Sequence, residues 1–178
     1  MSKKVETHLE PLIFLFTLNF ELSTFAPPPE RYNAPMSLST LDSAVKLFET
    51  FPKETKIQGL ISLADSLPRL APKEGEKWDV EDVRKDHECL DVVGLYARLE
   101  DGHVKLAAEV GKEVTTLTRA LTSLFVENLS GETTQNILSV EASIIPRIVG
   151  EALMRQRSNT AYYTLRRIHE AVRLLEAK

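Results

Sequence analysis

Cysteine is the scarcest chemically informative residue in this chain: among 178 residues there is one, Cys89. A single cysteine excludes an internal disulfide and excludes a zinc site built from several cysteines of one chain. What remains is a small buried hydrophobe or a reactive thiol, and composition does not distinguish the two. Glycine is also sparse, with 7 in the chain, which argues against a glycine-rich phosphate-binding loop.

Long apolar runs and an excess of positive charge are absent as well. The apolar stretch at residues 11–18 has about eight residues, whereas ~20 are needed to span a bilayer. The 22 basic and 26 acidic side chains give a net charge of −4, so no general attraction to nucleic acid or to an anionic membrane is expected. With 43% hydrophobic residues, the chain suits one folded domain preceded by a tail.

The N-terminal segment, residues 1–36, differs in character from the domain that we place at residues 37–178. Lys3 and Lys4 precede the apolar stretch, and the run from Phe25 to Pro27 that follows it is similar to the cleavage motif of plastid-targeting presequences in diatoms and related algae. The pattern supports two interpretations equally, a targeting presequence and a flexible tail. A presequence would direct the protein to the plastid stroma; otherwise we expect it in the cytoplasm.

The domain has the pattern of an α+β fold with a small antiparallel sheet. Apolar residues alternate on both sides of Asp101-Gly102, which predicts a hairpin over about 91–110, because both turn residues tolerate positive φ. The polar run at 68–88 is typical of a long loop. Apolar residues at helical spacing predict helices on both sides of the hairpin, at residues 39–51, 53–67, 114–129, 134–140, 144–153 and 158–175.

Cys89 lies where the polar loop meets the first predicted strand, which places its thiol near solvent. Cations lower the pKa of a thiol and acids raise it, and both flank Cys89, so its reactivity stays open at this point. The four histidines are scattered, so no metal site is expected. The arginines of the last helix, Arg166, Arg167 and Arg173, fit a solvated surface.

The order of several motifs resembles the SufE family, the sulfur acceptors of iron–sulfur cluster assembly. The resemblance runs from Leu41 to the C-terminus. It covers the helix that ends at Leu67-Pro68, a cysteine placed 12 residues before the Asp101 of the hairpin turn, and the Ser130-Gly131 helix stop. The run from Arg157 to Asn159 resembles the family's motif at the start of its last helix.

The resemblance implies a persulfide relay protein and desulfurase activator rather than a stand-alone enzyme. A cysteine desulfurase that uses pyridoxal phosphate would pass sulfur to Cys89, and the acceptor would deliver it to an iron–sulfur scaffold. It implies no cofactor bound to this chain, a thiol shielded at rest, and a monomer or weak dimer. The supporting or partner-binding candidates are His87, Glu109, Arg157 and Asn159, and we expect Glu109 and Arg157 on one face with Cys89.

The residues beside Cys89 depart from the family's motif. Glu88 replaces a glycine, Asp91 a serine and Gly94 a tryptophan. Glutamate removes backbone freedom that glycine would give. These departures motivate an alternative: a SufE-like interaction module or regulatory subunit that has lost sulfur transfer.

Overall fold

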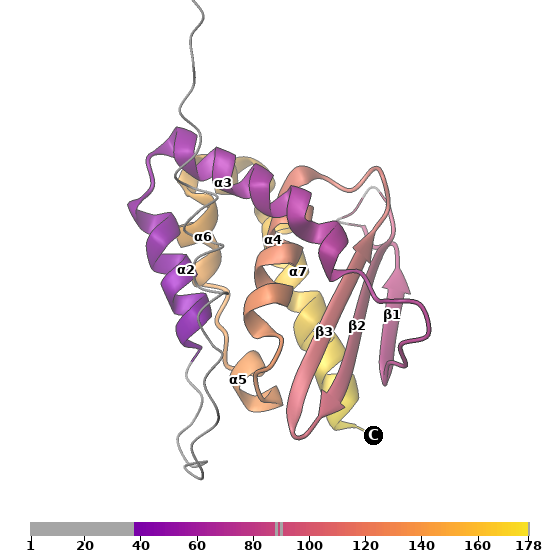
Figure 1. The fold of residues 1–178 in the computed structure, drawn as a ribbon. Helices are drawn as coiled ribbons and strands as arrows, with labels where there is room; N and C mark the ends of the chain where they lie inside the picture. Colours follow the sequence, from indigo (N-terminus) through magenta and orange to yellow (C-terminus); the bar gives the residue numbers. More distant parts are fainter. Residues whose placement is uncertain (1–37, 88, 90, 178) are drawn as a thin grey trace, which may run out of the picture. The chain divides into compact units, whose positions relative to one another are not determined.

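The computed structural model describes residues 38–177 except Glu88 and Leu90, and the backbone but not the side chain of Ser158. In chain order, the elements are α2 (Ser39–Thr50), α3 (Lys53–Ser66), the 3-10 helix η1 (Leu67–Leu70), β1 (Val80–Arg84), β2 (Val93–Glu100), β3 (His103–Val110), α4 (Thr116–Leu129), α5 (Thr134–Leu138), α6 (Ile144–Val149) and α7 (Glu151–Glu176). This succession confirms the predicted α+β class (Figure 1).

The sheet is antiparallel, with strand order β1-β2-β3. The predicted hairpin is confirmed: β2 and β3 pair in register from Val93 with Val110 to Glu100 with His103. Asp101 and Gly102 connect the two strands with φ values of 50° and 80°. Two consecutive positive φ values match the right-handed twist of the flanking strands, which is why an Asp-Gly pair serves here.

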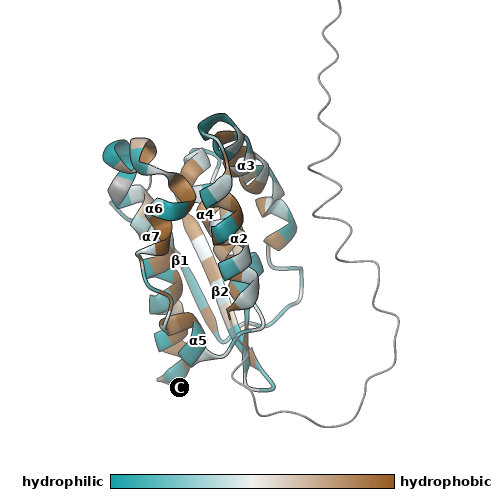
Figure 2. Cartoon of the chain, turned by 90° about the vertical axis from the view of Figure 1, so that its left-hand side faces the viewer, coloured by the Kyte–Doolittle hydropathy of each residue, from teal (hydrophilic) through white to brown (hydrophobic). Residues whose placement is uncertain are grey.

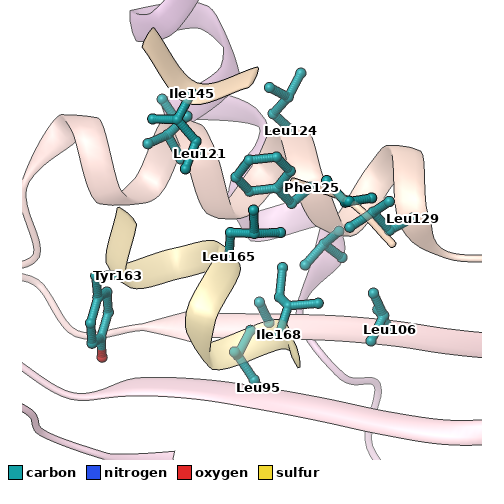
Figure 3. Packing of buried hydrophobic residues seen from close by; sticks show 14 of the residues in the cluster. Leu95, Leu106, Leu121, Leu124, Phe125, Leu129, Ile145, Tyr163, Leu165 and Ile168 are labelled. Atoms are coloured by element: carbon teal, nitrogen blue, oxygen red, sulfur yellow. The ribbon is translucent and has the colours of Figure 1, made fainter. Parts of the chain in front are cut away.

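One face of the sheet carries the helices α4 and α7 (Figure 1). Side chains alternate across a strand, and the positions of β2 and β3 that face these helices are apolar and buried: Val93, Leu95, Ala97, Val104, Leu106 and Ala108. They pack against the buried faces of α4 and α7, where Phe125 and Ile168 are fully buried (Figure 3). Brown and teal segments alternate along the helices in Figure 2, as expected of amphipathic helices.

The ends of the helices follow from local chemistry. Thr115 and Thr133 precede α4 and α5 and accept hydrogen bonds from backbone N–H groups of the first turn, as N-cap threonines do. After α4, Gly131 adopts φ 95°, a conformation that side chains disfavour. The predicted stop at Ser130-Gly131 is therefore confirmed.

The prediction of a loop throughout residues 68–88 is wrong, because this segment contains the end of η1 and all of β1. The apolar alternation that identifies a strand is missing from β1, because Asp82 and Arg84 carry charged groups on the same side of the strand as Val80. Asp82 pairs with a buried arginine of α7, and Arg84 pairs with Glu170 of the same helix. A strand that contacts its neighbours through ion pairs does not show the hydrophobic period.

The last helix begins earlier than predicted. It starts at Glu151, directly after Gly150 with φ 84°, and a kink at Arg157 (φ −138°, ψ 27°) interrupts the helical geometry. Ser158 therefore lies inside the helix instead of at its N-cap. The remaining helices agree with the predicted ranges to within a few residues.

The predicted tail or presequence at residues 1–36 lies outside the described residues, so its role and the plastid location stay predictions. Among the described helices, none combines the length and the apolar character that a bilayer crossing requires.

Phe125 provides a test of the packing between α4, α7 and the sheet. Phe125 is fully buried in the core, so we expect Phe125→Ala to lower the free energy of unfolding by about 3–5 kcal/mol, because it removes apolar contacts and leaves a cavity. Leu174→Ala, at a position that is 50% exposed, is the control and should change it by less than about 0.5 kcal/mol. Urea unfolding, followed by the fluorescence of Trp78, measures the free energy of unfolding of both variants. An equal loss of stability in the two variants would contradict the assigned core.

Candidate functional site around Cys89

Cys89 lies in the connection between β1 and β2, and its side chain is buried, with a relative exposure of 6%. The prediction of a thiol near solvent is therefore wrong, whereas the shielding implied by the family resemblance is seen. The hydroxyl groups of Tyr163 on α7 and Thr118 on α4 act on the thiol and lower its pKa. The connection thus turns its cysteine inward, toward the helices that cover the sheet.

A buried arginine, Arg167, stands beneath this connection. Its side chain is fully buried, and all of its N–H groups have acceptors. Nε donates to Oδ2 of Asp82 at 2.9 Å and Nη2 to the backbone oxygens of Asp82 and Val93 at 2.8 and 3.1 Å. Nη1 donates to Oδ2 of Asp86 at 2.9 Å and to the hydroxyl of Tyr163 at 2.6 Å. One guanidinium therefore joins α7, β1, β2 and the start of the cysteine-bearing connection.

Arg167 corrects the prediction that the arginines of the last helix are solvated. Arg166 and Arg173 are exposed as predicted, and only Arg167 of the three points inward. Position 167 lies on the same side of the helix as the buried Tyr163 and Ala171. From the sequence alone, however, an arginine at this position cannot be distinguished from a surface arginine, because its hydrogen-bond acceptors are not known. Those acceptors come from β1 and β2, which are far away in the sequence.

The cysteine environment sets the state of the thiol. Burial raises the pKa of Cys89 above its ordinary value, against the opposing effects of the Tyr163 and Thr118 hydroxyls and of the Arg167 charge. Burial also raises the pKa of Tyr163, which keeps its hydroxyl protonated. At neutral pH and with the connection closed, Cys89 is therefore a thiol, and thiols are poor nucleophiles compared with thiolates.

Asp86 anchors the connection on the β1 side. Its carboxylate accepts from Nε of Arg84 at 3.1 Å and from Nη1 of Arg167 at 2.9 Å, and its backbone oxygen accepts from the N–H of Cys89 at 3.1 Å. Burial disfavours the charged carboxylate, yet the two arginines outweigh burial and hold the pKa of Asp86 below its usual range. The anchor is thus ionised at neutral pH and weakens only in acid, as the pH falls below the ordinary value of 3.8.

Asp91 anchors the connection on the β2 side. Its carboxylate accepts from the backbone N–H groups of Val92 at 2.7 Å and Glu113 at 3.2 Å, and these hydrogen bonds lower its pKa. The backbone passes so close that a Cβ at Gly111 would lie 1.9 Å from Oδ2 of Asp91. The departure from the family's serine at this position therefore has a structural role, which is to fasten the connection to the segment that follows β3.

Glu109 lies on the opposite face of the sheet from the helices. It pairs with Gly94 in the β2–β3 register, and its carboxylate accepts a hydrogen bond from the Tyr96 hydroxyl. A Cβ at Gly94 would lie 3.0 Å from Cγ of Glu109, so the missing side chain at 94 makes room for this pair. The structure therefore does not bring Glu109 to Cys89, and the expectation of one shared face is not met for this residue.

The other predicted supporting residues are exposed. His87 lies in the turn just before Cys89, and Arg157 and Asn159 lie in α7 at and just after its kink. Tyr163, Thr118 and Arg167 are the residues that sequence reasoning missed. A weak signal for two of them is the spacing of Tyr163 and Arg167, four residues apart and hence on one side of a helix. Over the described residues, no group of His, Cys, Asp and Glu side chains has the arrangement of a metal site.

Comparison with known families identifies the fold. Residues 42–172 match the family model described as SufE, the Fe-S metabolism associated domain. The chain belongs to the SufE family. Membership places this SufE protein in iron–sulfur metabolism, a family setting that in general implies a desulfurase partner.

Solved structures with a similar fold are known. The SufE chain is similar to a hypothetical protein of Thermus thermophilus, with 26% identity and a TM-score of 0.60 over 80% of this chain and 100% of that one. It is also similar in fold to the N-terminal part of a nitrogen-fixing NifU-like protein of Brucella abortus, with 18% identity and a TM-score of 0.53 over 71% of this chain and 99% of that one. No curated protein matches the chain significantly.

Arg167 gives a prediction about stability. Arg167→Met leaves two aspartates and a tyrosine without their shared donor, and breaking a buried ion pair costs about 3–5 kcal/mol. Arg166→Met, at the exposed neighbouring position, is the matched control and should cost less than about 0.5 kcal/mol. Urea unfolding measures both variants. If Arg167→Met is no more destabilising than the control, the guanidinium does not hold the strands and α7 together.

Asp91 gives a prediction about accessibility of the thiol. Asp91→Ala releases one anchor of the connection, so a maleimide should label Cys89 about three times faster or more, because labelling needs the connection to open. Asp65→Ala, at an exposed position on α3, should leave the rate unchanged. Since the lowered pKa of Asp91 keeps it ionised above 3.8, the difference between the two variants should persist across neutral pH. Equal rates would show that Asp91 does not restrain the connection.

Proposed function

We propose that this SufE protein accepts sulfane sulfur from a cysteine desulfurase on Cys89, stimulates that desulfurase, and passes the sulfur to an iron–sulfur scaffold. The observation that supports this most is the setting of Cys89, the one cysteine of the chain, in a connection that is anchored at both ends and that buries the thiol. A persulfide carrier needs one sulfur nucleophile that is shielded from oxidants and can be exposed to a partner.

The transfer step uses no resident cofactor. The Cys89 thiolate attacks the outer sulfur of the persulfide on the desulfurase cysteine, and a new S–S bond forms while the S–S bond within the desulfurase persulfide breaks. The bonding electrons leave with the desulfurase cysteine as a thiolate, which then takes a proton. Cys89 now carries the persulfide. The sulfane sulfur changes carriers without any net oxidation or reduction of the pair.

The connection must open for this attack. With Cys89 6% exposed and the pKa of its thiol raised by burial, the closed form offers little thiolate. Moving Cys89 into solvent removes the cause of the raised pKa and gives the desulfurase access in the same motion. We infer that the partner binds the open connection, with exposed His87, Arg157 and Asn159 as candidate contacts. Glu109 could act only at a partner surface that extends to the other face of the sheet.

The raised pKa and burial of Cys89 also favour a second function. A thiol that stays buried would leave a SufE-like interaction module, which regulates a desulfurase without accepting sulfur. If the protein is such a regulator, Cys89→Ser should change neither its binding to the desulfurase nor the degree to which it stimulates desulfurase activity.

Intact mass spectrometry separates the two functions. Incubation with cysteine and a purified cysteine desulfurase should add about 32 Da to the protein, the mass of one sulfur, and Cys89→Ser should abolish the addition. The control is a reaction without cysteine, in which no sulfur is available. No addition to the wild-type chain, or an addition that survives Cys89→Ser, would rule out the carrier; unchanged stimulation by Cys89→Ser would then support the regulator.

A further inference from the structure

Residues 81–87 together with Cys89, which we name the β1 segment, have little apolar attachment to the rest of the domain. The segment begins in β1, at one edge of the sheet (Figure 1). After the buried Val80 at the start of β1, Cys89 is the one buried residue among the described residues up to Val92. Over this described stretch, apolar burial therefore holds the segment at Cys89.

The charged side chains of the β1 segment pair with one another. Nη1 of Arg84 lies 3.2 Å from Oδ1 of Asp82, and Nε of Arg84 donates to both carboxylate oxygens of Asp86 at 3.1 Å. The backbone N–H of Cys89 donates to the backbone oxygen of Asp86 at 3.1 Å. These contacts run from Asp82 to Cys89 within the segment, so they survive if the segment moves as one piece.

Apart from Cys89, the β1 segment meets α7 through charged groups. Arg167 donates to the carboxylates of Asp82 and Asp86 at 2.9 Å each, and Arg84 pairs with Glu170. The segment also pairs with β2 along the short antiparallel ladder. Separation at this boundary therefore breaks ion pairs and a few ladder hydrogen bonds but little apolar packing, which is typical of a region that opens locally.

The chain on each side of the β1 segment is fixed by contacts that do not involve α7. Before the segment, the ring of Trp78 lies 5.9 Å from the ring of Tyr96, and the guanidinium of Arg98 lies 4.8 Å from the Trp78 ring centroid. After it, the Asp91 carboxylate accepts from the backbone N–H of Glu113 at 3.2 Å. The limits of a moving unit are therefore set between Trp78 and Asp91.

We infer that Cys89 becomes accessible when the β1 segment separates from α7 and β2 as one unit, and that the ion pair between Arg84 and Glu170 restrains this opening. The inference rests on the proposed function only in taking exposure of Cys89 as the event that a desulfurase needs. It adds that β1 leaves the sheet edge with the cysteine. Opening also uncovers the guanidinium of Arg167, which is fully buried beneath the closed segment.

Glu170→Gln tests the inference, because it removes a charge on the α7 side of the boundary and leaves Cys89 and Arg167 in place. The Arg84–Glu170 pair is partly exposed, so its loss should favour the open form about two- to fivefold. Maleimide labelling of Cys89 and hydrogen exchange of the β1 amides should both accelerate by this factor, when reclosing is faster than either reaction. Glu151→Gln, which removes an exposed pair with Arg155 on the same helix, is the matched control and should change neither rate.

A second comparison needs no variant. In the wild-type chain, the free energy of opening obtained from Cys89 labelling should equal that obtained from the β1 amides, and both should lie below that of the β3 amides. Labelling of Cys89 while the β1 amides stay protected would overturn the inference, because the connection would then open without β1. Equal values for β1, β3 and Cys89 would also overturn it, because the thiol would then be exposed only by global unfolding. Unchanged rates in Glu170→Gln would refute the restraining ion pair.

No desulfurase takes part in these measurements, so this inference and the proposed function fail separately. A shared opening of β1 and Cys89 without sulfur loading would support the moving unit and refute the carrier. Normal sulfur loading with protected β1 amides would refute the moving unit and leave the carrier intact.

Discussion

The buried guanidinium of Arg167 is the constraint on which the rest of this site depends. It links α7 to β1, to β2 and to the start of the connection that bears Cys89. A buried charge is costly unless every donor has an acceptor, and here two carboxylates, two backbone oxygens and a phenol share its N–H groups. Lysine, with a compact ammonium group and three donors, does not reproduce this planar fork. The position therefore requires arginine.

The same arginine explains why β1 carries charges where a strand usually carries apolar residues. Asp82 and Arg84 complete a network that ends at Glu170 on α7. β1 is thus attached to the helical layer by ion pairs, while β2 and β3 are attached by apolar packing. The connection after β1 joins the same network, because Asp86 pairs with Arg167. On the β1 side, Cys89 is therefore positioned by an ion pair.

Two of the residues that depart from the family's motif, Asp91 and Gly94, have local structural roles, whereas Glu88 lies outside the described residues. Asp91 fastens the connection to the backbone after β3, where only a glycine fits at position 111. Gly94 leaves space for the Tyr96 and Glu109 pair on the far face of the sheet. Together with Asp86, Asp91 holds the connection in the arrangement in which Cys89 is buried and the pKa of its thiol is raised.

The α+β class, the Asp101-Gly102 hairpin and the extent of α4 follow from the sequence, because periodicity and turn chemistry are local properties. The choice of Cys89 as the candidate reactive residue also came from the sequence, through the cysteine count. The burial of Cys89, the strand β1 and the inward direction of Arg167 do not follow from the sequence. Each depends on residues distant along the chain: Cys89 on the buried core in which it packs, and Arg167 on Asp82 and Val93. From the sequence alone, a charged side chain is predicted to be exposed to solvent, because its ion-pair partners are not known. Only the tertiary structure could therefore place Arg167 at the centre of the site.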